Sequence, residues 1–379
     1  MKKKDRNQSV SENIPEESAP EVQEMPPEKI EKVKRAGQKR FKKMNRVLDR
    51  LFGFLFVTVF ALGVGGLGYE YVMLKGPSEA LKEKFINTFV ETRRFNFIPY
   101  IFMESSDMVK YFYGSTEELD ELKATQYDDT LVTINTENQT DETGTDAYGL
   151  VDEDGDGIIY QKIQYHGSTG YMLVVLDPTR VFCGMPDAYG GGGLTLEEYC
   201  QKYNAIGGIN AGGFVDDNGA GTGGLPDGIT IIDGVTYNSN NTGPVAGLTE
   251  DGKLFCGYLT YEDCVNTELK YCVSFGPLLI FNGQQVPEST LDSGINPRTC
   301  IGQRADGAII LLAIDGRQGY SIGVSFADCS DIMYSYGCVN AINMDGGSST
   351  CMVYNGQLVN HPTNAAGGTR YLPNAWLVK

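Results

Sequence analysis

The longest apolar run of the chain lies near its N-terminus. Residues 51–74 read LFGFLFVTVFALGVGGLGYEYVML, and Glu70 is the only charged side chain among them. A run of this length can cross the hydrocarbon core of a bilayer as one helix. Ten basic and two acidic residues lie between Lys29 and Arg50, and such an excess of positive charge is typical of the cytoplasmic side. The pattern predicts a single-pass membrane protein that contacts the lipid bilayer through residues 51–74.

This anchor would leave the N-terminus in the cytoplasm and the rest of the chain outside the cell. A cleaved signal peptide is the alternative, but the 50-residue polar leader is too long for one. Residues 1–50 are predicted to form a basic, largely disordered tail. Residues 75–148 are predicted to form a helical stalk followed by a polar linker, because apolar residues recur at helical spacing after Pro77 and residues 124–149 are rich in Thr, Asp and Asn.

Beyond the linker, residues 149–379 contain short apolar runs separated by Gly, Asp and Asn, a pattern that favours a sheet-rich domain. Two predicted strands, residues 307–315 and 338–345, flank a segment with helical spacing and end on Asp315 and Asp345. If the crossover between them is right-handed and parallel, both aspartates lie at one edge of the sheet. Open sheets of this kind bind their ligands at that edge.

An earlier segment is predicted to repeat this strand–helix–strand arrangement. A strand at residues 171–177, a helix at residues 196–203 and a strand at residues 205–210 follow one another, and the last ends on Asn210. The sequence therefore predicts an α+β fold with a mixed β-sheet core, helices and strand–helix–strand units, preceded by one transmembrane helix.

Glycines follow all three polar strand ends. Gly346 and Gly347 come directly after Asp345, and such residues permit a positive φ and let a ligand approach the backbone N–H groups. The alternative is that Asp-Gly only marks a turn. For one strand end the two interpretations are equal, but the three together favour a ligand site.

Charge narrows the class of ligand. From Lys75 onward the chain has 17 basic and 39 acidic residues, a net charge of −22, which disfavours nucleic acid as a partner. Three of the few arginines in the domain lie in turns rich in glycine or proline, where they could bind phosphate or carboxylate in bidentate fashion or simply form surface salt bridges. These are Arg298, Arg317 and Arg370.

The sequence gives only weak support for a metal site. The nine cysteines form no CxxC motif and the chain has two histidines, so a Cys/His zinc site is not expected. The cysteines are either small buried hydrophobes or, in an exported domain, partners in disulfides. Asp152–Gly157 reads DEDGDG, like the start of an EF-hand loop, but Ile163 stands where that loop needs a glutamate. We interpret the segment as a tight acidic turn, with a calcium site as the alternative.

Six segments, in order and spacing, resemble the phosphodiester glycosidase family: INAGGF, FGPLLIFNGQ, PRTCIG, IDGRQG, AINMDGGSSTCMVYNG and HPTNAAGGTRYLPNAWLV. The resemblance covers residues 149–379. It departs from the family pattern at Ser348, where a third glycine is usual, at Cys351 and at Cys300. It implies a hydrolase, a glycosidase that cleaves the C1–O bond of a sugar-1-phosphodiester, with an N-acetylglucosamine-like sugar as the leading candidate.

By position, the resemblance implies two groups of site residues. The catalytic group is Asn210, Thr299, Asp315 and Asp345, and the group that binds substrate and phosphate is Arg298, Arg317, Arg370, Gly346, Gly347 and Ser348. Asp345 or Asp315 would serve as base or electrostatic stabiliser. Arg298 and Arg370 would hold the phosphate.

The sequence thus predicts a membrane-anchored extracellular glycosidase acting on surface or exported glycans. The alternative is a non-catalytic domain of the same fold that binds a glycan during envelope or polysaccharide assembly. No cofactor is required by the predicted chemistry, and a divalent cation such as calcium is an open alternative.

Overall fold

The computed structural model describes residues 63–72, 74–78, 82, 86, 101, 116–136, 139–215, 222–291, 293–364 and 368–379. The chain divides into two compact units, Met1–Tyr69 and Glu70–Lys379. In the first unit the described residues, 63–69, are helical. The second unit contains every sheet described below.

The prediction of a transmembrane helix is corrected. Over the described ranges, no helix combines the length and the apolar character needed to cross a membrane. Residues 51–62 of the predicted span lie outside the described residues. The predicted fold class, single-pass location and bilayer contact are corrected on this finding.

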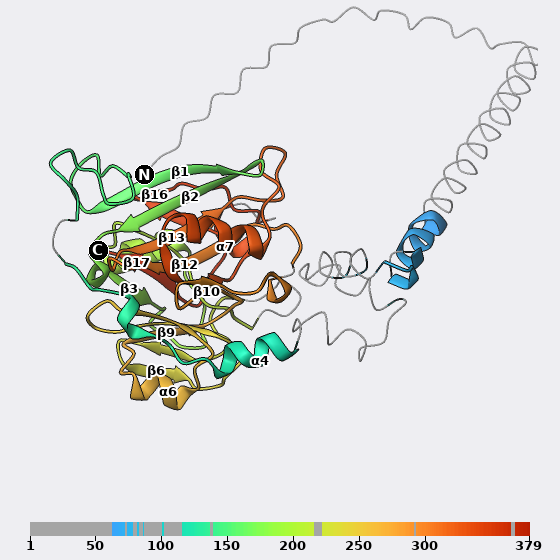
Figure 1. Ribbon diagram of the computed structural model, residues 1–379, viewed down its shortest axis with the longest axis horizontal. Coiled ribbons are helices and arrows are strands. Elements are labelled where there is room, and N and C mark those ends of the chain that lie inside the picture. Colours follow the sequence, from blue (N-terminus) through green and yellow to red (C-terminus); the bar gives the residue numbers. More distant parts are fainter. Residues whose placement is uncertain are drawn as a thin grey trace, which may run out of the picture. The chain divides into compact units, whose positions relative to one another are not determined.

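The largest sheet has seven strands, and all its described pairs are antiparallel. In spatial order they are β1 (Ile158–Tyr165), β2 (Ser168–Val175), β13 (Ile309–Ile314), β12 (Arg298–Arg304), β14 (Cys338–Met344), β10 (Leu278–Phe281) and β11 (Gln284–Gln285). The long, apolar strands β2 and β13 are buried along their whole length, because other elements cover both faces of the sheet (Figure 1).

Two further sheets have five strands each. One is ordered β16 (Gln357–Leu358), β15 (Met352–Tyr354), β4 (Gly207–Asn210), β17 (Ala375–Val378) and β3 (Val181–Gly184). The other is ordered β6 (Val235–Asn238), β5 (Thr230–Ile232), β9 (Tyr271–Ser274), β7 (Val245–Leu248) and β8 (Leu254–Gly257). One apolar core cluster joins residues from all three sheets, including Leu173, Ile209 and Leu254.

Between residues 116 and 379, the described helices are few and short. They are α4 (Thr116–Ala124), α5 (Leu196–Tyr203), α6 (Tyr261–Asn266) and α7 (Phe326–Ser335), with 3-10 turns η2 (Asp129–Leu131), η3 (Pro178–Arg180), η5 (Glu288–Thr290) and η6 (Gly347–Ser349). α7 packs on β10, β12 and β14 (Figure 1). Its apolar residues recur at helical spacing, and Ile332 and Met333 are buried against the sheet.

The unit from β13 through α7 to β14 differs from a simple crossover. β12 pairs with both β13 and β14, so it lies between them. Because both strands run antiparallel to β12, they are parallel to each other and end at the same edge. The second predicted unit is not formed, since β2 and β4 belong to different sheets. Short strands cut by glycine turns pair in antiparallel fashion, which replaces the predicted mixed core.

Part of the predicted linker is anchored to the domain. The ring of Tyr127 stacks on Phe255 at 4.3 Å between centroids, and its hydroxyl donates to the carbonyl of Leu254 at 2.9 Å. Further on, Asp146 forms a 2.7 Å ion pair with Arg304, and both side chains are fully buried. The predicted stalk helix, by contrast, lies largely outside the described residues.

All nine cysteines are among the described residues, and all are buried as free thiols. This is the arrangement of small apolar core residues, the first of the two alternatives. The Sγ atoms of Cys264 and Cys272 lie 3.7 Å apart.

Candidate functional site

Asp345 ends β14 and begins a glycine turn that forms the centre of the site. The turn is held by two backbone bonds, from the N–H of Asp345 to the carbonyl of Ala211 at 3.0 Å and from the N–H of Gly347 to the carbonyl of Pro297 at 2.9 Å. Gly347 has φ +60°, a conformation that glycine adopts at little cost. A Cβ on Gly346 would lie 2.9 Å from the carbonyl of Pro297, so this position has no room for a side chain.

Asn210 and Thr299 support this turn through a chain of hydrogen bonds. Asn210 is completely buried and donates from Nδ2 to the backbone carbonyl of Asp345 at 2.6 Å. Its Oδ1 accepts from the Thr299 hydroxyl at 2.8 Å and from the N–H of Cys351 at 3.1 Å. Two of the four residues predicted to be catalytic thus act on the site through the backbone of Asp345.

Arg370 and Ser348 lie on the outer side of the turn. Nη1 of Arg370 donates to the hydroxyl of Ser348 at 3.3 Å, and the guanidinium lies 4.8 Å from the centroid of the Phe214 ring. Burial lowers the pKa of Arg370, and the negative charge of Asp345 opposes that shift. A half-buried arginine and a buried carboxylate therefore face the same small region.

The other two predicted arginines donate hydrogen bonds to oxygens of the protein itself. Arg298 is buried, donates to the carbonyls of Val324 at 3.1 Å and Gly294 at 2.7 Å, and stacks 3.8 Å above the ring of Phe326. Arg317 has φ +57° and donates from two nitrogens to Oδ1 of Asn296, at 2.7 and 3.1 Å.

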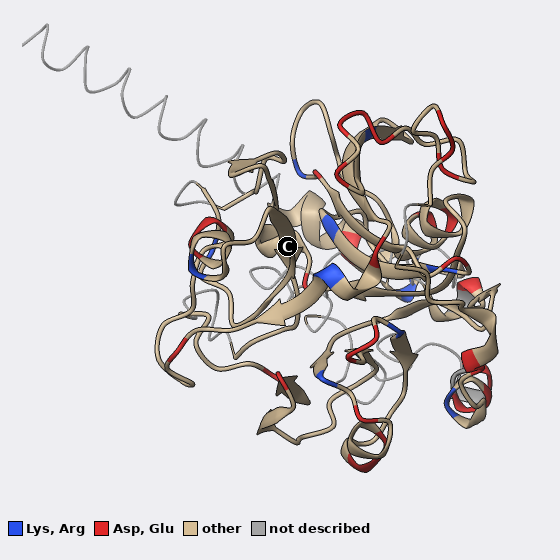
Figure 2. Cartoon of the chain, turned by 90° about the vertical axis from the view of Figure 1, so that its left-hand side faces the viewer, with Lys and Arg blue, Asp and Glu red and all other residues tan. Residues whose placement is uncertain are grey.

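Both arginines nevertheless lie beside the glycine turn. The guanidinium of Arg317 is 3.4 Å from the place where a Cβ on Gly347 would stand, and Cδ of Arg298 is 3.9 Å from the corresponding place on Gly346. They raise the positive potential under the turn, which an anionic ligand requires in so acidic a protein. In Figure 2 the positions of Asp and Glu, coloured red, are spread over loops and helices of the chain.

Asp315 lies at the same sheet edge but belongs to a different local group. It follows β13, two strand positions from β14, so the two backbones are about 10 Å apart. Its side chain is fully buried, and its Oδ1 accepts from the N–H of His361 at 2.8 Å and from Nδ2 of Asn360 at 3.2 Å. Its Oδ2 accepts from the Tyr320 hydroxyl at 3.2 Å and lies 3.3 Å from Nδ1 of His361.

His361 is the residue that sequence reasoning missed. It lies in the last of the six family-like segments, but the sequence predicted no role for it in the site. The only available signal was rarity, because the chain has two histidines. Its pairing with Asp315 depends on a contact across 46 positions of the chain, which no local pattern reports.

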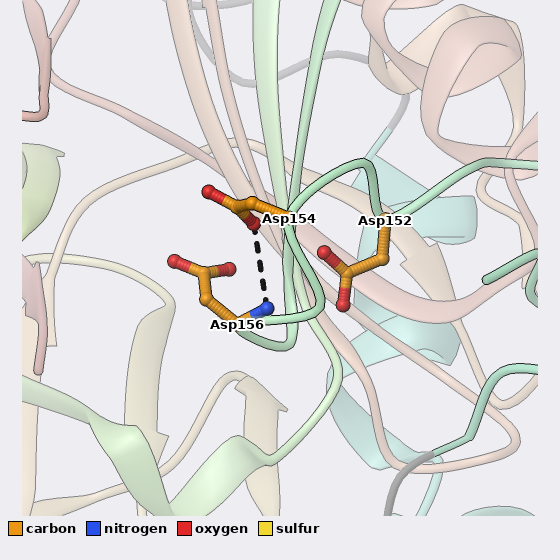
Figure 3. A group of neighbouring side chains, drawn as sticks. All are labelled: Asp152, Asp154 and Asp156. Carbon is orange, nitrogen blue, oxygen red and sulfur yellow. Dashed lines mark hydrogen bonds between the residues drawn. The ribbon is translucent and has the colours of Figure 1, made fainter.

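The acidic turn at residues 152–157 is separate from this site. One carboxylate oxygen each from Asp152, Asp154 and Asp156 lies within 4.8 Å of the others (Figure 3). Asp152 accepts from the N–H groups of Gly155 at 3.0 Å and Gly157 at 2.9 Å, and both glycines have positive φ. Burial raises the pKa of Asp156. These are the contacts of a tight acidic turn, and we assign no metal to it.

Carboxylates and arginines that meet at strand ends beside exposed backbone turns are typical of domains that bind an anionic, oxygen-rich ligand. Comparison with known proteins is more specific. Residues 203–379 match the family model for phosphodiester glycosidases. The predicted resemblance to the phosphodiester glycosidase family is confirmed over this segment.

Several relatives carry the same kind of domain. The N-acetylglucosamine-1-phosphodiester alpha-N-acetylglucosaminidase of Bos taurus is 26% identical over 218 residues, which are 52% of this chain and 41% of that protein. The Homo sapiens protein of the same name is 25% identical over 218 residues, 52% of this chain and 42% of its own length. The chain thus spans about two fifths of the length of these relatives.

A solved structure shows the same fold. The catalytic domain of the zebrafish N-acetylglucosamine-1-phosphodiester alpha-N-acetylglucosaminidase, auto-inhibited by its pro-peptide, superposes with a TM-score of 0.50 at 21% identity. The match covers 58% of this chain and 81% of that one. At this identity the likeness concerns the fold.

Proposed function

We propose that the domain at residues 149–379 is a glycosidase that hydrolyses the C1–O bond of a sugar-1-phosphodiester. The observation that carries the proposal is the contact between the Arg370 guanidinium and the Ser348 hydroxyl, at 3.3 Å, in the glycine turn that begins with Asp345. The family match supports the reaction class. The names of the mammalian relatives make an N-acetylglucosamine-like sugar the leading candidate.

In the proposed reaction, the bond between C1 and the phosphate oxygen breaks and the sugar passes through an oxocarbenium-like state. The carboxylate of Asp345 would stabilise the positive charge that develops at C1. The phosphate monoester departs with the bonding electrons, and Arg370 with the Ser348 hydroxyl would hold its growing negative charge. A phosphate is already a good leaving group, so charge stabilisation matters more here than strong acid catalysis.

The remaining predicted residues take supporting roles in this proposal. Asn210 and Thr299 hold the backbone of Asp345, and the backbone of Gly346 and Gly347 orients the sugar. Arg298 and Arg317 contribute positive potential near the turn and do not bind the phosphate directly, because their guanidinium groups already donate to oxygens of the protein itself. The scheme uses no cofactor. A divalent cation such as calcium is the alternative.

The test is a panel of sugar-1-phosphodiesters that differ in the sugar, incubated with the full chain with and without a chelator, while released reducing sugar is measured. We expect release from at least one diester, unchanged by the chelator. We also expect the Asp345→Asn variant to lose about 10²-fold or more of the rate, the usual cost of removing one electrostatic contact to a transition state.

Asp233→Asn is the matched control. Asp233 is exposed at a turn with φ +52°, which asparagine adopts readily. Its carboxylate lies 3.6 Å from Nζ of Lys270, and 73% of its side chain is exposed. Its rate should equal that of the wild type. Glycan binding without release across the whole panel would instead identify a non-catalytic glycan-binding domain. A rate abolished by the chelator would establish the metal alternative.

A further inference from the structure

The pair formed by Asp315 and His361 has an arrangement that the proposed reaction has not used. Both oxygens of the Asp315 carboxylate accept protein hydrogen bonds, and the side chain has no exposed surface. A carboxylate placed in this way cannot reach the C1 atom of a substrate. It can orient a group that does.

The His361 ring is the exposed member of the pair. Its Nδ1 lies 3.3 Å from Oδ2 of Asp315, whereas 64% of the His361 side chain is exposed. A carboxylate at Nδ1 favours the tautomer in which Nδ1 carries the proton. The lone pair of Nε2 is then available on the other side of the ring. This is how a buried carboxylate prepares an imidazole to accept a proton.

The segment that carries His361 is joined to the glycine turn. Asn360, the preceding residue, donates from Nδ2 to Asp315 at 3.2 Å and to the carbonyl of Thr350 at 3.2 Å, and Thr350 directly follows the Gly347–Ser349 turn. The same segment continues to Arg370. His361 therefore follows the residue, Asn360, that links the Asp315 group to the end of the glycine turn.

The titratable groups around the pair remain in their neutral forms at ordinary pH. Tyr320 packs edge-to-face on the His361 ring at 5.8 Å, and Tyr171 reaches Asp315 from β2. Burial raises the pKa of each tyrosine to about 12, with the charge of Asp315 as a further cause. Asp315 is therefore the carboxyl group that contacts the ring.

We propose that His361 is the proton-accepting residue of the glycosidase and that Asp315 is its positioning residue. This rests on the function proposed above. As a water oxygen bonds to C1, Nε2 takes the proton from that water, and the C1–O bond to phosphate breaks with its electron pair on the departing phosphate monoester. The imidazolium then releases its proton to solvent.

The variant His361→Asn tests the role of Nε2 separately from the fold. The backbone N–H of residue 361 still bonds to Asp315, and the asparagine amide can replace Nδ1 as a donor. We expect kcat to fall 10²- to 10⁴-fold, the usual range for a lost general base, with KM and Tm close to wild type. The acidic limb of the pH–rate profile should disappear. In His361→Ala, added imidazole should restore part of the rate.

His166→Gln is the matched control. Its ring is also exposed, and its Nδ1 also meets an aspartate, Asp328, at 3.0 Å, but it lies on the turn between β1 and β2. Its kinetics should match those of the wild type. Because the chain has two histidines, this variant also leaves the His361 ring as the single imidazole in an NMR spectrum.

In that His166→Gln protein, long-range ¹H–¹⁵N correlations should show the proton on Nδ1, and inorganic phosphate should shift the ring resonances. An active wild type with an equally active His361→Asn variant would overturn this inference and leave the proposed function standing. A ring protonated at Nε2 and indifferent to phosphate would also overturn it. A wild type that releases no sugar from any diester would overturn both proposals together.

Discussion

At the scale of single residues, two aspartates with the same local sequence occupy different environments. Each follows an apolar strand and precedes a glycine. Asp345 lies near Arg370 at the glycine turn, whereas Asp315 is enclosed by donors from the 320 and 360 segments. The difference separates a residue suited to act on a substrate from one suited to position another side chain.

The support of Asp345 can be tested through Thr299, whose hydroxyl donates to Asn210 in a fully buried position. In Thr299→Val the shape is retained, but Oδ1 of Asn210 loses a donor. We expect the free energy of unfolding to fall by about 1–2 kcal/mol, measured by urea denaturation, and sugar release to fall because the turn loses a support. Thr299→Ser, which retains the hydroxyl, should recover most of both quantities, and equal losses in the two variants would contradict this assignment.

At the scale of elements, β12 is the strand on which the site depends. It lies between β13 and β14, begins with Arg298 and Thr299, and is completely buried. Because it pairs with both, β13 and β14 run parallel and end at the same edge of the sheet, with β12 between them. Gly302 lets β12 pack closely beneath α7, because the space that a Cβ would need is occupied.

Gly302→Ala should therefore destabilise the sheet. The added Cβ would lie 2.7 Å from Cε of Met333, 2.8 Å from Sγ of Cys338 and 2.9 Å from the backbone carbonyl of Asn340. The methionine can move, but the carbonyl is part of β14. We expect a loss of about 1–3 kcal/mol in the free energy of unfolding. Gly243→Ala, where the new Cβ meets no atom within 4 Å, is the control and should stay close to wild type.

At the scale of the whole molecule, the folded unit begins before residue 149. Arg304 at the end of β12 is fully buried between Asp146 and Asp306, with 2.7 Å contacts to each, and its guanidinium lies 4.1 Å from the ring centroid of Tyr148. Its two ion-pair partners raise the pKa of Arg304, against the effect of burial. Residues before β1 thus neutralise a charge inside the domain.

A fragment of residues 150–379 should consequently be less stable than one of residues 126–379. It leaves Arg304 with Asp306 alone, and breaking one side of a buried ion pair costs about 3–5 kcal/mol. Urea denaturation of the two fragments measures the difference, and equal stabilities would show that Asp146 is dispensable. In the full chain, Asp146→Asn should reproduce much of the loss. Asp141→Asn should change little, because Asp141 is exposed and the asparagine retains its acceptor oxygen.

Local sequence was enough to locate the strands that end at the predicted site residues. Apolar runs that end on Asn210, Asp315 and Asp345 correspond to β4, β13 and β14, because strand formation and glycine turns depend on neighbouring residues. The order of six short motifs also identified the family that the comparison confirms for residues 203–379. The apolar run at residues 51–74 was less informative, since hydrophobicity alone does not establish a membrane-spanning helix.

Only the tertiary structure decided which contacts each predicted site residue makes. Three features join residues that are distant in sequence. β12 lies between β13 and β14, Arg298 and Arg317 donate to oxygens of the protein itself, and His361 pairs with Asp315. Such contacts arise when sheets pack and bury polar groups that must then find partners. For this protein, sequence determined which chemical groups stand at the strand ends, and packing determined which of them remain available to a substrate.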